Sequence, residues 1–272
     1  MSNSSLDAMQ HVMKQNVLKE EFGWEIPVET VPIPSRGILY SPDSRLYKKE
    51  ILKIKAMTAR EEDILTSNAL IKEGTAVDHL ITSCVLEEGV NALDLVLGDK
   101  NALMVSIRIT GYGKDYRIKP ICESCGKISD INFDLSDLGI KRLKIDPIEE
   151  GKNEFSFQLP VTKKNVIFKF LTSHDDKERD RKQKFYKDTF KVDNNVTSYL
   201  ESTIISIEGI TDKNKINHFI KNMPAFDSKS LRNFIRDNEP GIDMSHQFAC
   251  HHCQHVNKAN LAITPEFFWP RT

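Results

Sequence analysis

The sequence lacks the long hydrophobic run that a membrane-spanning helix requires. No apolar stretch approaches the roughly 18 consecutive residues needed to cross a bilayer. Residues 1–27 also lack the apolar core of a secretory signal. We therefore expect no membrane partner, and a protein that is made and kept in a reducing cytoplasm, where structural disulfides are disfavoured.

An excess of charge of either sign is also missing. The 272 residues include 38 basic and 39 acidic side chains, which gives a formal net charge of −1. Domains dedicated to binding nucleic acid are normally basic, so this balance disfavours a nucleic-acid partner. The length is sufficient for one large domain or for two of ordinary size.

The sequence signatures of common enzyme classes are absent as well. There is no glycine-rich phosphate-binding loop, no dinucleotide-binding fingerprint, no nucleophile elbow and no histidine pair of a zinc protease. Residues 173–180, SHDDKERD, combine one histidine with several carboxylates, and we interpret them as the solvated face of a charged helix. We therefore predict a protein that is not an enzyme and has no catalytic residues.

Cysteine is scarce, but four of the five cysteines form two pairs with the spacing of metal ligands. The pairs are Cys122 with Cys125, in ICESCGK, and Cys250 with Cys253, in ACHHCQ. The segments on both sides of each pair have the pattern of β-strands, and a strand, Cys-x-x-Cys, strand unit is typical of a zinc knuckle. Gly126 permits a positive φ in the first turn, whereas Gln254 occupies the equivalent place in the second.

Two knuckles together offer four thiolates, which is a ligand set of tetrahedral structural Zn²⁺. We therefore predict a structural zinc ion held by Cys122, Cys125, Cys250 and Cys253. A redox-active pair should open a helix within a βαβ pattern, and neither pair here does. A disulfide is also disfavoured in the cytoplasm. An iron–sulfur cluster also fits four cysteines. The neighbouring histidines could replace a thiolate, but we interpret them as solvated; they are His251, His252 and His255.

The chain between the two pairs is long for a zinc ribbon. Loop-closure entropy grows only with the logarithm of loop length, whereas a structural zinc site contributes on the order of 10 kcal/mol. A metal can therefore close the base of an inserted unit. The sequence predicts an α+β fold, with a helical N-terminal region plus a split four-cysteine zinc ribbon that carries a large, mainly helical insertion.

The chain divides into five expected segments. They are an N-terminal arm (1–30), a strand plus three-helix region (31–120), a first zinc knuckle and strand (121–145), an inserted hairpin plus helical subdomain (146–245), and a second zinc knuckle with the C-terminal strand (246–272). Within the insertion, residues 154–171 alternate as a β-hairpin, and residues 174–240 are expected to be helical.

The first expected helix spans residues 58–72. Thr58 and Glu61 have the spacing of a capping box at its start. Gly74 is expected to end it, because glycine adopts the left-handed conformation found after many helices.

Two more helices are expected before the first knuckle. Thr75 and Asp78 repeat the capping-box spacing, and Cys84 falls on the apolar face that follows, as a small buried hydrophobe. Asp99 is expected to cap the third helix, which ends at the GYG of residues 111–113.

Two further features each have two interpretations. Residues 177–191 carry seven basic side chains interleaved with acids. They form either a solvated face or a contact for nucleic acid, although the acids cancel much of the positive field. The C-terminal aromatic residues Phe267, Phe268 and Trp269 either cover the core or anchor a partner.

Three stretches, taken together, resemble a known family. They are IPSRGILY (33–40), MTAREEDILTSNALIKEGTAVDHLITSCV (57–85) and GDKNALMVSIRITGYGKDYRIKPICESCG (98–126). In this order they are similar to the baseplate hub proteins of T4-like contractile-tailed bacteriophages, over residues 31–140. Residues 146–249 and the C-terminal knuckle carry much less of the family pattern.

The resemblance implies a phage tail protein that acts in baseplate hub assembly, as a hub subunit or an assembly factor. Its partners would be other hub or tape-measure proteins, and the family brings no catalytic residues. It would be found in the host cytoplasm during assembly, with the tail baseplate of the virion as a further location. The alternative, from the residues alone, is a zinc-ribbon protein that binds nucleic acid.

Overall fold

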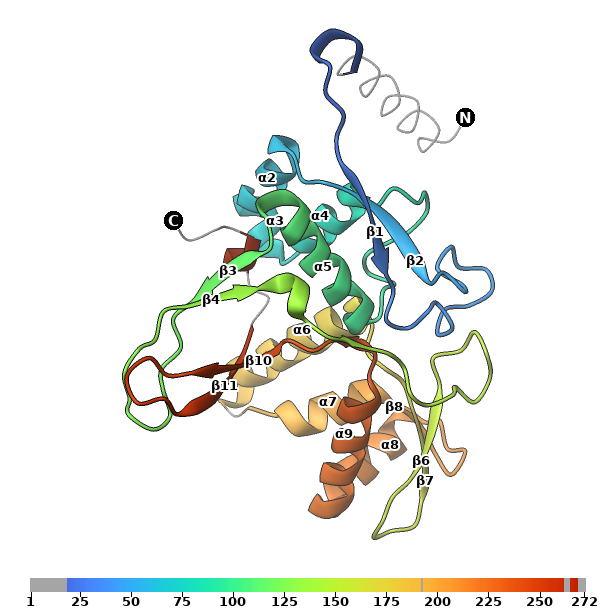
Figure 1. The fold of residues 1–272 in the computed structure, drawn as a ribbon. Coiled ribbons are helices and arrows are strands. Elements are labelled where there is room, and N and C mark those ends of the chain that lie inside the picture. Colours follow the sequence, from blue (N-terminus) through green and yellow to red (C-terminus); the bar gives the residue numbers. More distant parts are fainter. Residues whose placement is uncertain (1–18, 192, 262–264, 269–272) are drawn as a thin grey trace.

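The computed structural model describes residues 19–191, 193–261 and 265–268 (Figure 1). The expectations for residues 1–18 of the N-terminal arm and for Trp269 lie outside this range. Helices and small antiparallel sheets of two or three strands make up the described chain, so the α+β class is confirmed. No helix in the described part of the chain is both long enough and apolar enough to span a membrane.

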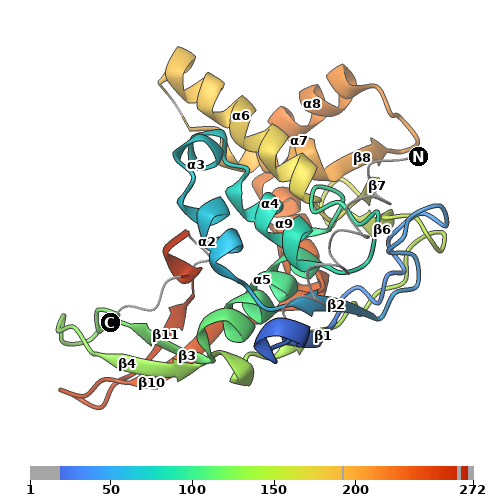
Figure 2. The same ribbon diagram turned by 90° about the horizontal axis from the view of Figure 1, so that it is seen from above.

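Residues 28–112 combine one antiparallel strand pair with four helices. β1 (Val28–Pro32) pairs antiparallel with β2 (Ile51–Lys55). The helices are α2 (Ala59–Thr66), α3 (Asn68–Glu73), α4 (Ala76–Cys84) and α5 (Leu97–Tyr112). Figure 2 shows β1 and β2 on one side of α5, with α2, α3 and α4 on the other side of that helix.

The capping box predicted at the start of the first helix is present, with Thr58 as the N-cap and Glu61 three residues on. The expected single helix 58–72 is interrupted, however, because Ser67 is extended and separates α2 from α3. Hydroxyl side chains at this point compete with the helix for backbone partners, and Thr66 donates to the carbonyl of Glu62. Gly74 ends α3 in the left-handed conformation, as predicted.

Glu61 also connects α2 to its neighbours. Its buried carboxylate accepts hydrogen bonds from Lys55 Nζ at 2.7 Å and from Ser83 Oγ at 2.6 Å. Burial acts to raise its pKa, but the bonds from Lys55, Ser83 and Thr58 prevail and lower the pKa of Glu61 to about 2. The residue is therefore ionised at neutral pH and joins β2, α2 and α4.

The second predicted capping box is wrong. Thr75 makes no side-chain cap, and Asp78 instead forms ion pairs with Lys100 Nζ, at 2.7 Å, and with Lys177. Cys84 is fully buried, as predicted, and burial raises the pKa of its thiol to about 12. The carboxylate of Asp78 thus pairs with lysines of other helices instead of capping the start of α4.

Asp99 does not cap α5, because the helix begins two residues earlier, at Leu97. Its buried carboxylate accepts hydrogen bonds from Ser35 N at 2.9 Å, Ser35 Oγ at 2.5 Å and the Tyr40 hydroxyl at 2.6 Å. The side chain thus fixes the segment between β1 and β2 against α5. α5 ends at Tyr112, followed by Gly113, as the sequence predicts.

The second half contains a three-stranded sheet and four helices. The expected hairpin is formed by β6 (Phe155–Gln158) and β7 (Asn165–Phe168), and β8 (Ile204–Ile207) pairs with β7 as a third strand. Residues 174–240 are therefore not helical throughout, because the β-branched run at 204–207 favours a strand. The helices are α6 (Ser173–Phe190), α7 (Asn195–Thr203), α8 (Lys213–Asn222) and α9 (Ala225–Asn238).

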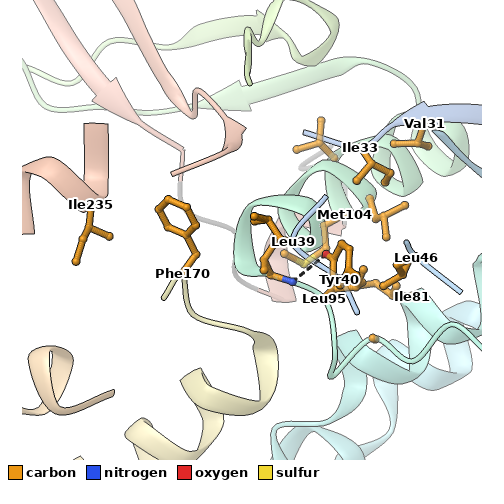
Figure 3. Packing of buried hydrophobic residues seen from close by; sticks show 14 of the residues in the cluster. Val31, Ile33, Leu39, Tyr40, Leu46, Ile81, Leu95, Met104, Phe170 and Ile235 are labelled. Carbon is orange, nitrogen blue, oxygen red and sulfur yellow. Dashed lines mark hydrogen bonds between the residues drawn. The ribbon is translucent and has the colours of Figure 1, made fainter. Parts of the chain in front are cut away.

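One continuous hydrophobic core joins the two halves. It includes Val31, Ile33 and Met104 from the first half together with Phe170 and Ile235 from the second. Figure 3 shows these side chains, with Ile235 and Phe170 on one side of the cluster and Val31 and Ile33 on the other. The residues between the two cysteine pairs therefore pack on the same core as the N-terminal helices.

A short strand pair brings the ends of this intervening chain together. β5 (Ile140–Lys141) pairs antiparallel with β9 (Gly241–Ile242). Asp243 N also donates to the carbonyl of Gly139 at 2.8 Å. The pairing of β5 with β9 thus places the segment that follows the first cysteine pair beside the segment that precedes the second. This brings the two cysteine pairs near each other.

Candidate metal centre

The two cysteine pairs lie in the loops of two β-hairpins. β3 (Asp115–Ile118) pairs with β4 (Ile131–Asp134), and β10 (Ser245–Ala249) pairs with β11 (Val256–Asn260). The four flanking strands predicted from the sequence are all present. Figures 1 and 2 show the hairpins side by side, extending away from the helices.

The two loops have the same backbone conformation. Cys122 N donates to the carbonyl of Lys127, and Cys250 N donates to the carbonyl of His255, both at 2.9 Å. The residue after each second cysteine has a positive φ, which is 68° at Gly126 and 60° at Gln254. Gln254 therefore also adopts a positive φ, although the sequence supports this conformation less strongly at Gln254 than at Gly126.

The four sulfur atoms of these loops lie within 4.8 Å of one another. The Cys122–Cys253 and Cys125–Cys250 Sγ–Sγ distances are each 3.7 Å. A regular tetrahedron with metal–sulfur bonds of about 2.3 Å has edges of about 3.8 Å, whereas a disulfide requires about 2.05 Å. The spacing therefore fits four ligands around one metal ion.

Two polar residues extend this arrangement from one hairpin to the other. Ser129 Oγ lies 3.6 Å from Cys250 Sγ, and Asn257 Nδ2 lies 3.5 Å from Cys122 Sγ. Each residue comes four positions after the second cysteine of its own pair and contacts the first cysteine of the other pair. Both are buried, so the two hairpins are related by reciprocal contacts around the sulfur atoms.

Asn257 has a further role in the loop of the partner hairpin. Its Oδ1 accepts a hydrogen bond from Glu123 N at 2.9 Å, while its Nδ2 also donates to the carbonyl of His255. Ser129 and Asn257 were not predicted from the sequence. The signal for them in the sequence is that each is a polar residue four positions after the second cysteine of its own pair.

Hydrogen bonds favour the thiolate form at the two buried cysteines. The backbone N–H of Cys125, together with that of Ser124, lowers the pKa of Cys122. The Ser129 hydroxyl and the His252 N–H lower the pKa of Cys250 to about 5.

Cys253 shows the opposite shift. The His255 N–H acts to lower its pKa, but burial and the three neighbouring sulfur atoms raise the pKa of Cys253 to about 11. Four thiolates at this distance repel one another, and a cation between them would favour ionisation of all four. The chemistry of the site therefore fits a thiophilic metal ion.

The three histidines beside the second pair are exposed, as the sequence analysis interpreted them. Of the histidine, cysteine and carboxylate side chains in the described residues, the group close enough to hold a metal ion consists of the four cysteines. The predicted residues are therefore brought together, and no histidine is needed to complete the set.

The charged segment at the start of α6 has structural partners. Asp175 forms the N-terminal capping box with Thr172 and pairs with Lys169 Nζ at 2.7 Å. Four of the seven basic residues at 177–191 form ion pairs, namely Lys177, Arg179, Lys182 and Lys187. These pairs favour the solvated-face interpretation of the segment over a nucleic-acid contact.

The aromatic residues near the C-terminus cover the core. Phe267 and Phe268 are fully buried, and the Phe267 ring packs 5.2 Å from the ring of Tyr116 in β3. The buried Arg108 of α5 donates from Nε to the carbonyl of Phe267 at 3.0 Å. Of the two interpretations of this cluster, the described residues support the one in which the aromatic side chains pack inside the protein.

Comparison with known proteins identifies one family. The sequence model of the family described as "T4 bacteriophage base plate protein" matches residues 41–269. The match includes both cysteine pairs and the whole of residues 146–249, where the sequence analysis found little family pattern. No curated protein and no solved structure matches the chain.

Proposed function

The chain belongs to the family of T4 bacteriophage base plate proteins, and from that premise we propose that it acts in assembly of the baseplate hub through contacts with other hub or tape-measure proteins. It is either a hub subunit in the virion tail or an assembly factor. The observation that carries the proposal is the family match over nearly the whole described chain. The order of the motifs at 33–126 supports the hub in particular.

The proposed role of the cysteine site is structural. Cys122, Cys125, Cys250 and Cys253 would bind one Zn²⁺ with no coordination position left open for a substrate. The ion would join two hairpins whose cysteines lie 125 positions apart in the sequence. Such a site organises a binding scaffold, and we propose that the protein has no catalytic activity.

The hub role is tested in the phage itself. A phage with an early stop codon in this gene should produce no complete tails in a non-suppressing host, because the baseplate would lack a component or a factor needed to build it. Electron microscopy of the lysate measures this, and growth in a suppressing host is the control. Complete, infectious tails in the non-suppressing host would refute the proposal. Mass spectrometry of purified wild-type virions then separates a subunit from an assembly factor.

The contacts of Asn257 predict an effect on metal affinity. Asn257→Ala removes the N–H group beside Cys122 Sγ and the acceptor of Glu123 N. Loss of such a contact typically weakens metal binding by about 10- to 100-fold. Competition with a chromophoric chelator measures the zinc dissociation constant. Asn260→Ala, at an exposed position of the same strand, is the matched control, and an equal dissociation constant in both variants would contradict the assigned role of Asn257.

A further inference from the structure

A groove with three arginines lies between α6, α7 and α9, away from the cysteine site. Its volume is about 450 Å³. Arg179 of α6 and Arg232 and Arg236 of α9 line it together with Tyr199 of α7 and several amide side chains. The described residues that form its wall include no aspartate or glutamate. The groove therefore presents an excess of hydrogen-bond donors with positive charge.

The positive charge of this groove is only partly neutralised. Arg179 pairs with Asp176 at 2.5 Å and with the more distant Asp180 at 3.6 Å, and the exposed Arg236 pairs with Asp237 at 3.1 Å. Arg232 makes no ion pair within the described residues. The Nε atoms of Arg179 and Arg232 are both buried without a hydrogen-bond partner there. Unsatisfied buried donors of charged groups are unfavourable, so the described residues leave the hydrogen-bonding capacity of these two guanidinium groups incompletely used.

Two ionisable groups near the arginines do not cancel this charge. Burial and the nearby Glu239 raise the pKa of Tyr199 to about 12, so its hydroxyl stays neutral and can donate. Burial raises the pKa of Glu239 to about 7, so this carboxyl carries only part of a negative charge at neutral pH.

Guanidinium groups recognise carboxylates and phosphates through paired N–H donors. The groove has room for one or two side chains and is too small for a nucleic-acid duplex. We propose that Arg179, Arg232 and Arg236 form a binding site for an acidic peptide segment of a partner protein. The inference rests on the proposed function in taking the occupant to be a protein.

The test uses the purified full-length chain and a fluorescein-labelled hexaglutamate peptide, measured by fluorescence anisotropy at low salt. We expect saturable binding that Arg232→Gln weakens about tenfold, the effect of losing one charge-assisted hydrogen bond. Arg236→Gln is a second groove variant, with a weaker expected effect because Arg236 is exposed and already paired. Arg181→Gln, at an exposed position of α6, is the control and should bind as the wild type does. Thermal midpoints confirm that every variant is folded.

The proposal would be overturned by no saturable binding of hexaglutamate, by an equal loss in Arg232→Gln and Arg181→Gln, or by tighter binding of a labelled hexathymidylate than of hexaglutamate. A hexaglutamine peptide should not bind, and binding equal to that of hexaglutamate would also refute it. These measurements require no phage, so failure here leaves the tail-assembly result unaffected, and failure of tail assembly leaves the peptide result readable.

Discussion

Replacement of Cys250 by serine is expected to release the metal ion and to lower the thermal midpoint by about 10 °C or more. Cys250 is fully buried, its Sγ lies 3.7 Å from that of Cys125, and Ser129 and His252 both direct donors at it. A serine hydroxyl is a poor ligand beside three thiolates. Structural zinc contributes on the order of 10 kcal/mol to folding, so the remaining three cysteines would hold the two hairpins together much more weakly.

The control for this prediction is Cys84, the cysteine outside the site. Cys84→Ala removes one small buried side chain and should cost about 1–2 kcal/mol without loss of metal. Elemental analysis of protein purified without added metal should give one zinc per chain in the wild type and in Cys84→Ala, and much less in Cys250→Ser. A wild-type ratio well below one, with the four thiols of the site titrating freely, would refute the zinc site, as would similar melting of the two variants.

The four cysteine ligands of the candidate site could be predicted from the sequence because the pattern that specifies them is short-range. Cys-x-x-Cys between two strands specifies a knuckle locally, and two such units offer four thiolates. Ser129 and Asn257 carry no comparable signal, because each contacts a cysteine more than a hundred positions away in the sequence. Their role depends on how the two hairpins face each other, and only the three-dimensional arrangement reveals this.

The same distinction explains the errors in the fold. The capping box at Thr58 is local and was predicted, whereas Asp78 and Asp99 look like helix-start residues but bind groups from distant segments. Tertiary contacts override local preference at both positions. The strand β8 was missed for a related reason, since its β-branched residues lie inside a charged helical region and become a strand by pairing with β7.

The residue before Asp99 has a different kind of requirement. Gly98 lies in the first turn of α5, where the backbone of Pro240 and Gly241 approaches closely. A Cβ atom at Gly98 would lie 1.7 Å from the carbonyl oxygen of Pro240 and 2.9 Å from Cα of Gly241. Both atoms belong to the backbone, so no side chain can rotate away. Glycine is needed here because a side chain has no space. The close contact joins α5 to β9, which pairs with β5 at the two ends of the segment between the cysteine pairs.

Gly98→Ala is therefore expected to lower the free energy of unfolding by about 3 kcal/mol, because α5 and β9 must move apart and the core between them loosens. Denaturant unfolding measures this. Gly139→Ala is the matched control, since a Cβ there meets nothing within 4 Å; its effect should stay within about 0.5 kcal/mol. If the two variants were equally stable, the close approach of α5 and β9 would be contradicted. If Gly98→Ala unfolds earlier yet binds one zinc at low denaturant, the cysteine site and the α5–β9 contact stabilise the fold independently.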